Sequence, residues 1–308
     1  LKKSRNSEAL YADLSYDLNK FNVDAAARFE NYSDFGSALT GKLALRYELF
    51  KNFSLRGAVG TGFRAPSLQQ QYFNNSYSDI STSGSGIVNK GIFTNDSAIA
   101  QEIGFDKLKE EKSVNASAGF TFKPVDKLFI TLDGYFIKVK DRIVITSQFS
   151  DPSFAAYDVE SARFFANAVD TETKGVDLVV SYDLALGGGN LNINLAGNYT
   201  ETKITKFNFP EKVLASHSQD EFFGPDQINI IESLSPKTKA SLGLNYKINK
   251  FNFLVRNTYF GEVIRDGFPY GSVQKFSPKV VTDVSVGYDI TKKVNFTIGA
   301  NNLFDVFP

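Results

Sequence analysis

The sequence predicts an all-β protein, an antiparallel up-and-down transmembrane β-barrel to which this chain contributes about twelve strands. First, apolar and polar residues alternate with a period of two, over segments near or above the roughly 9 to 11 residues that a tilted membrane strand needs. Second, tight turns and mostly long loops alternate strictly between these segments, which places nearly all of the loop mass at one end. Third, there is no apolar run of about 18 residues, so helical membrane spans are excluded.

The first four expected strands precede the longest loop of the chain. They occupy residues 10–18, 21–29, 42–49 and 53–64. A tight turn at Asn19-Lys20 closes the first hairpin, and a second lies near Phe50. Pro66 should end the fourth strand, because proline cannot donate a ladder hydrogen bond. Roughly 45 mostly polar residues follow, a length that normally marks function or disorder.

Eight further strands are expected beyond this loop. They occupy residues 113–122, 128–145, 176–184, 191–199, 240–248, 251–263, 280–290 and 294–302. Tight connections are expected near Asn19, Phe50, Lys123, Ala185, Asn249 and Thr291, and the longer ones near Asp34, Arg64, Thr146, Lys203 and Arg265. A soluble sandwich built from so many sequential hairpins, with no helix pattern to cover a face, would be oversized, so the barrel is favoured.

The alternation also predicts which side chains face lipid. The residues expected to point outward are Leu43, Leu45, Phe120, Leu178, Leu195, Leu242, Val286 and Phe296. The residues expected to face the lumen are Arg28, Lys42, Arg46, Arg56, Asp133, Asp177 and Asp283. Charges that recur on one face of successive strands fit a water-filled interior, because lipid-facing charges are costly.

Composition excludes several function classes. Lys plus Arg and Asp plus Glu number 34 each, so the chain has no overall field for nucleic acid, and no nucleic-acid partner is expected. Cysteine is absent and His217 is the only histidine, which removes the usual zinc ligands and thiol nucleophiles. The glycines at 60, 62 and 187–189 lack the context of a phosphate-binding loop. We therefore expect no enzymatic activity, no metal site and no cofactor.

Seven segments, taken in order, resemble landmarks in the C-terminal barrel of TonB-dependent outer-membrane receptors. They are GTGFRAPSLQQQYF from Gly60, EKSVNASAGFTF from Glu111, LDGYFIKVKDRIV from Leu132, TKGVDLVVSY from Thr173, LSPKTKASLGLNY from Leu234, YFGEV from Tyr259 and IGANNLFDVFP from Ile298. The resemblance implies the outer membrane of a Gram-negative bacterium and a barrel of roughly 22 strands, plugged by an N-terminal domain. Residues 1–308 would then be the C-terminal part of that barrel, without the plug domain, TonB box, early strands and last strand.

The resemblance also implies partners. They are outer-membrane lipid, the plug domain of the same parent chain, the TonB-ExbB-ExbD complex acting through the absent N-terminal region, and a small-molecule ligand such as a ferric chelate. Strands near Ala9 and Asn302 would otherwise present unpaired edges, which are costly in hydrocarbon. We therefore expect missing strands to pair with both edges, and the segment expressed alone to fail to form a heat-stable barrel.

The long loops carry the candidate ligand-binding residues. These are Arg64, Gln69, Gln70, Gln71, Tyr72, Phe73, Tyr77, Arg142, Phe149, Tyr157, Arg163, Phe222 and Phe223. Aromatic side chains beside arginines and amides suit a bulky, partly aromatic or anionic ligand, through stacking and charge-assisted hydrogen bonds. The alternative is that these aromatic residues pack the loops together or lie at the outer-leaflet girdle.

Two functions fit this pattern. The first is a TonB-dependent receptor that imports a scarce ligand, most simply a ferric siderophore or a similar chelate, captured by the long extracellular loops. The second is a passive outer-membrane porin or adhesin, whose loops only bind or whose pore only conducts. A plug domain and TonB box upstream in the parent gene would discriminate between them.

Overall fold

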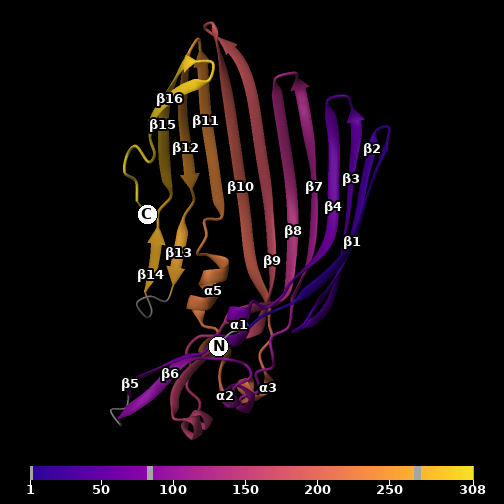
Figure 1. Ribbon diagram of the computed structural model, residues 1–308. Coiled ribbons are helices and arrows are strands. Elements are labelled where there is room, and N and C mark those ends of the chain that lie inside the picture. The colour runs from indigo at the N-terminus through magenta and orange to yellow at the C-terminus, as the bar shows by residue number, and fades with distance from the viewer. Residues whose placement is uncertain (1–2, 82–85, 267–271, 308) are drawn as a thin grey trace.

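The computed structural model describes residues 3–81, 86–266 and 272–307. Its main feature is one large antiparallel sheet whose consecutive strands curve around a common axis (Figure 1). In chain order the wall strands are β1 (Ser7–Leu18), β2 (Phe21–Tyr32), β3 (Gly36–Phe50), β4 (Phe53–Arg64), β7 (Glu111–Val125), β8 (Leu128–Ile145), β9 (Val159–Leu186), β10 (Gly189–Phe207), β11 (Thr238–Ile248), β12 (Phe251–Phe260), β15 (Lys279–Thr291) and β16 (Val294–Ala300). Each pairs with its neighbours in this order, so the predicted up-and-down wall is confirmed.

Smaller elements occupy the long connections and gather at one end of the wall (Figure 1). They are α1 (Leu68–Tyr72), β5 (Asn75–Ile80), β6 (Ile87–Phe93), α2 (Ala98–Glu102), the 3-10 helix η1 (Pro152–Tyr157), α3 (Glu211–Ser216), α4 (Gln219–Phe222), α5 (Pro225–Glu232), β13 (Val263–Asp266) and β14 (Val273–Phe276). We call these elements and their connections the loop layer. Strand β6 pairs in parallel with the first residues of β9, which extends the sheet into this layer. No helix in the described part of the chain is long and apolar enough to cross a membrane.

The two faces of the wall follow the predicted alternation. One transverse row, read through the strand registers, is wholly apolar: Phe53, Phe122, Ile130, Val180, Leu195 and Leu242. Leu43, Leu45, Val286 and Phe296 are all more than 40% exposed to solvent in the isolated chain, as expected of side chains that contact lipid.

The opposite face carries the charges. One row joins Arg46, Arg56, Gly119, Asp133 and Asp177 across five neighbouring strands. The Arg56 Nε donates to Asp133 Oδ1 at 2.7 Å, reaching across the strand that contains Gly119. A Cβ at position 119 would overlap the Asp133 carboxylate and the Leu132 carbonyl, so this crossing requires glycine.

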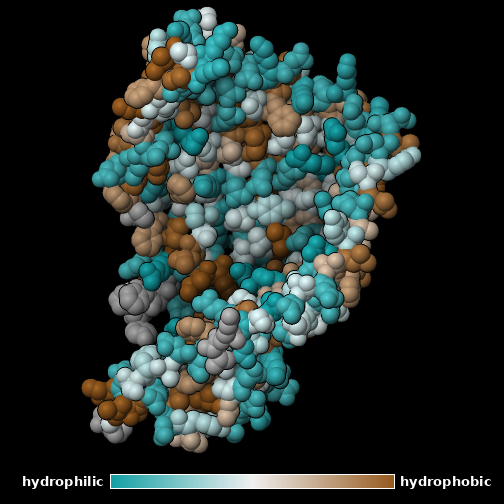
Figure 2. Space-filling model, viewed as in Figure 1, coloured by the Kyte–Doolittle hydropathy of each residue, from teal (hydrophilic) through white to brown (hydrophobic). Residues whose placement is uncertain are grey.

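The registers place the other predicted lumen residues on the same face. Arg28 lies beside Thr40, Lys42 beside Gly60, and Asp283 beside Arg256. The wall face turned to the viewer in Figure 2 is largely hydrophilic.

The hydrophobic core lies in the loop layer and in the part of β9 that enters it. Its largest fully buried side chains are Phe154, Phe164, Phe222 and Phe223. The physical reason is that the apolar side chains of the wall face lipid. Only segments beyond the strand ends can therefore bury apolar residues against one another. The first long connection was expected to be mostly polar, but it also contributes Ile99 and Phe105 to this core.

We expect Leu242→Arg to destabilise the folded barrel by about 2 to 4 kcal/mol, because it places a charge on the lipid face near mid-strand. The neighbouring Ser241→Arg, on the opposite face, should cost much less. Reversible unfolding of the complete receptor in lipid vesicles by urea would measure both. Equal losses for the two variants would contradict the assignment of faces.

Candidate functional site

Arg64 ends β4 and anchors the start of the loop layer. Its Nε donates to Glu111 Oε2 at 2.8 Å, and Glu111 Oε1 also accepts from the Ile143 backbone N–H at 2.6 Å. Glu111 is only 7% exposed, whereas half of the Arg64 side chain is exposed. Arg64 therefore joins the ends of β4, β7 and β8, and a ligand could reach only the guanidinium edge that faces solvent.

The other candidates of the first loop divide into two groups. Gln70 closes a capping box with Ser67, and Gln71 donates to Asp34 at 3.0 Å, so both side chains have structural partners. The Lys3 ammonium lies 4.6 Å from the centre of the Tyr72 ring. The side chains of Gln69, Phe73 and Tyr77 form no hydrogen bond or ring contact with other described residues. Gln69 and Tyr77 are exposed and Phe73 is half-buried.

The second and third loops place the remaining candidates differently. Tyr157 is 38% exposed at the end of η1, and Arg142 is half-buried opposite Val169. Arg163 holds a buried Nε that has no hydrogen-bond partner in the described part of the chain.

Phe149, Phe222 and Phe223 are at most 5% exposed and build the loop core, with ring centres of Phe149 and Phe222 4.1 Å apart. These three side chains offer no surface to a ligand, so we do not retain them as binding residues. The alternative weighed for the loop aromatics, that they pack the loops together, describes where these three lie.

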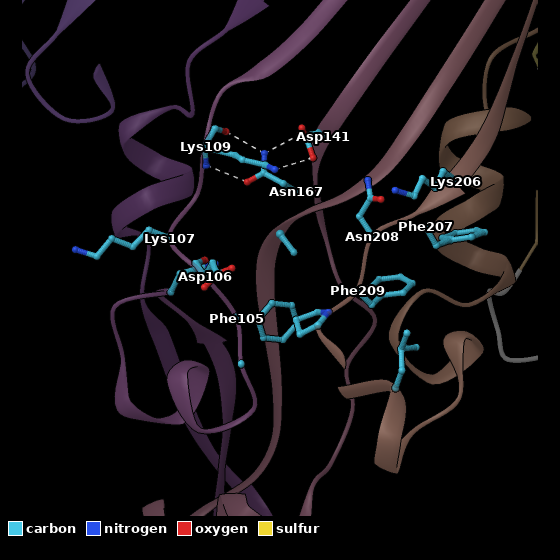
Figure 3. Close-up of a pocket in the computed structure, with 15 residues that line it drawn as sticks. Phe105, Asp106, Lys107, Lys109, Asp141, Asn167, Lys206, Phe207, Asn208 and Phe209 are labelled. Carbon is cyan, nitrogen blue, oxygen red and sulfur yellow. Dashed lines mark hydrogen bonds and ion pairs between the residues drawn. The ribbon is translucent and has the colours of Figure 1, made fainter. Parts of the chain in front are cut away.

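A cavity of about 450 Å³ lies where the three long loops meet (Figure 3). Its walls include three lysines, three asparagines and three phenylalanines: Lys107, Lys109, Lys206, Asn95, Asn167, Asn208, Phe105, Phe207 and Phe209. Cationic, amide and aromatic groups thus converge on one space, together with the carboxylates of Asp106 and Asp141, and its lysines and aromatic rings suit a ligand that is anionic and partly aromatic.

Asn167 holds one side of this cavity together. Its Oδ1 accepts from the Lys109 N–H at 3.0 Å, and its Nδ2 donates to the carbonyls of Lys109 and Asp141 at 2.9 and 2.7 Å (Figure 3). The Lys109 ammonium lies 3.0 Å from Asp141 Oδ1, so that charge is compensated. Lys206 forms no ion pair within the described residues, which leaves it as the cation best placed to meet an anionic ligand.

Only part of this cavity could be predicted from the sequence. Phe207 and Phe209 stand out as aromatic residues of the third loop, and they stack with ring centres 5.8 Å apart. Lys107, Lys206 and Asn167 have no local signal, because their roles arise only when three distant loops meet. Within the described residues, no group of three or more His, Asp or Glu side chains could hold a metal ion.

His217 fastens the third loop to the second. Its Nε2 lies 2.8 Å from Asp151 Oδ2 and its Nδ1 3.0 Å from Glu221 Oε2, while the ring packs edge-on against Phe222. Burial by itself would lower the pKa of His217, but hydrogen bonds to Asp151 and Glu221 outweigh it and raise this pKa above its usual value. When protonated, the imidazole donates to both carboxylates and so acts as a clasp between them.

The chain belongs to the TonB-dependent receptor family, since residues 2–303 match the family described as TonB dependent receptor-like, beta-barrel. Proteins of this family reside in the outer membrane of Gram-negative bacteria and are receptors and transporters rather than enzymes.

Solved structures share the fold. The ferric enterobactin receptor PfeA of Pseudomonas aeruginosa matches with a TM-score of 0.68 and 16% identity, over 98% of this chain and 40% of that one. The siderophore receptor PirA of the same organism matches with a TM-score of 0.65 and 17% identity, over 98% of this chain and 46% of that one. The vitamin B12 transporter BtuB of Vibrio cholerae is 31% identical over 68 residues, which are 22% of this chain and 11% of BtuB. The chain thus spans less than half the length of each.

Replacement of Arg64 by alanine should destabilise the loop layer by about 1 to 2 kcal/mol, because the buried Glu111 carboxylate loses its cation. Arg64→Lys should recover part of this loss. Urea unfolding of the complete receptor, followed by hydrogen exchange at Ile143, would measure the effect. An unchanged Ile143 exchange rate in Arg64→Ala would show that Glu111 does not depend on this contact.

The His217 clasp should make the loop layer depend on pH. A raised folded-state pKa stabilises the fold below the unfolded value of about 6.5, and this stabilisation is lost as pH rises through the folded pKa. Hydrogen exchange of residues 211–222, corrected for intrinsic rates, should therefore quicken as the pH rises from about 6.5 through the folded-state pKa. His217→Gln should abolish that dependence, while Lys212→Gln should retain it. If His217→Gln showed the same pH profile of exchange as the unmodified receptor, the pH dependence would belong to another group.

Proposed function

We propose that this chain is the C-terminal part of the barrel of a TonB-dependent importer that takes up a ferric siderophore or a similar anionic chelate. The observation that carries the proposal is the cavity at the meeting of three long loops. An uncompensated Lys206 and the stacked Phe207 and Phe209 line it, which supplies charge and aromatic surface to one ligand.

The expected path of transport follows from the arrangement of the wall. The loop layer captures the ligand at one end, and the charged face of the wall lines the route inward. The plug domain of the parent chain would close the lumen, and the TonB-ExbB-ExbD complex would pull on it to open the way. A passive porin would need no such loop cavity, which makes this alternative the weaker one.

The named relatives bear on the ligand class. PfeA is a receptor for ferric enterobactin, PirA a siderophore receptor and BtuB a transporter of vitamin B12. Lys206, which forms no ion pair within the described residues, favours an anionic ligand, and this supports a ferric chelate over a corrinoid.

The proposal is tested by uptake in a strain that lacks the complete receptor. Restored receptor should support growth under iron limitation on one of a panel of ferric siderophores, and growth should require TonB. Growth restored only by vitamin B12 would replace the chelate with a corrinoid. Equal solute entry with and without TonB would favour the passive barrel.

Charge reversal in the cavity should weaken binding directly. The double variant Lys107→Glu and Lys206→Glu should reduce affinity for the identified anionic ligand by about tenfold or more, because each charge-assisted contact contributes on the order of 1.5 to 3 kcal/mol. Lys275→Glu, an exposed lysine of β14 in another loop, is the matched control. Calorimetry with the purified complete receptor would measure all three proteins. Equal affinities would remove this cavity from the binding site.

A further inference from the structure

The outer face of the wall changes from apolar to partly charged toward the loop layer. Val59, Ala116 and Phe136 form an apolar row in register. The next two rows toward the loops are Thr61–Val114–Lys138–Glu172 and Phe63–Lys112–Lys140. Because the registers between β4, β7 and β8 are continuous here, these lysines lie on the same lipid-side face as the apolar row.

A groove of about 450 Å³ lies among these rows. Leu39, Phe63 and Val114 give it an apolar side, and Lys112, Lys138 and Lys140 give it a cationic side. The ladder between β3 and β4 ends at the pair Lys42 and Gly60, so the strands separate beyond it and open the groove. Leu39 and Val114 are 73% and 52% exposed, so the protein itself leaves this apolar surface uncovered.

The lysines of the groove exceed the acids beside them. The Lys112 ammonium lies 3.2 Å from Glu110 and the Lys138 ammonium 3.0 Å from Glu172. Lys140 is exposed and forms no ion pair in the described part of the chain. One positive charge therefore stands uncompensated directly beside an apolar groove.

We propose that this groove binds a lipid of the outer leaflet that carries a net negative charge on a phosphate monoester, unlike a zwitterionic phosphodiester lipid. The lipid phosphate lies on Lys140, with Lys112 and Lys138 on either side, and an acyl chain covers Leu39, Phe63 and Val114. The position carries the choice of occupant, because the groove lies on the membrane face, at the boundary where the apolar rows give way to charged ones. A free phosphate would meet the lysines but leave the apolar side uncovered.

The experiment compares the purified complete receptor with the variant Lys112→Gln, Lys138→Gln and Lys140→Gln. Native mass spectrometry in detergent would measure retention of bisphosphorylated lipid A, of phosphatidylcholine and of inorganic phosphate. The receptor should retain lipid A, and the triple variant should bind it at least tenfold more weakly. Lys292→Gln with Lys293→Gln, at the tight-turn end of the wall, is the matched control and should bind as the receptor does.

Three outcomes would overturn the proposal. Equal retention of lipid A by the triple variant would show that the lysines do not hold it. Equal retention of phosphatidylcholine would reduce the groove to an unspecific apolar surface, and binding of inorganic phosphate with lipid A excluded would make it an anion site. Folding of each variant is checked by the gel mobility of the unheated protein. If the triple variant does not fold, Lys140→Gln alone provides the same comparison. The result is independent of the imported ligand.

Discussion

Backbone hydrogen bonding in hydrocarbon governs this structure. A segment that crosses a bilayer as strands must pair its N–H and C=O groups with neighbouring strands, since lipid offers no substitute. The paired registers from β1 to β16 meet this need except at the outer edges of β1 and β16, and they fix which side chains face lipid. The large apolar residues of the wall lie on the lipid face, so the hydrophobic core lies in the loop layer instead. The same ladder thus explains why Phe154 and Phe164 are buried while Leu43 and Phe296 are exposed.

The wall could be predicted from the sequence because a strand's alternation is a local property. The end of β4 at Arg64 follows from Pro66 two residues later, and the tight turns separate the strands clearly. The extension of β9 back to Val159 was missed. The even-numbered residues from Ala162 to Ala168 alternate with less buried ones and enter the loop core, so the period of two is present there. Three of these four residues are alanines, which favour strands only weakly.

The candidate site was predicted less well, for a different physical reason. Aromatic residues in a polar loop can be exposed to a ligand or can nucleate a core, and composition does not separate these outcomes. Phe149 and Phe222 are in the core, whereas Tyr77 and Tyr157 are exposed. Helices of the loop layer are four to eight residues long, too short for a helical period to be read. The cavity around Asn167 depends on distant loops meeting, which leaves no trace in neighbouring residues.

The row from Arg46 to Asp177 has an electrical consequence. Its positive members lie on β3 and β4, and its negative members lie on β8 and β9. Because Gly119 lets the Arg56 and Asp133 side chains cross β7 directly, the row lies close to the backbone and takes little width from the lumen. This row therefore carries a dipole directed along the wall, between β3 and β4 on one side and β8 and β9 on the other. Under the proposed import function, a dipolar solute that passes this row would be oriented by its field.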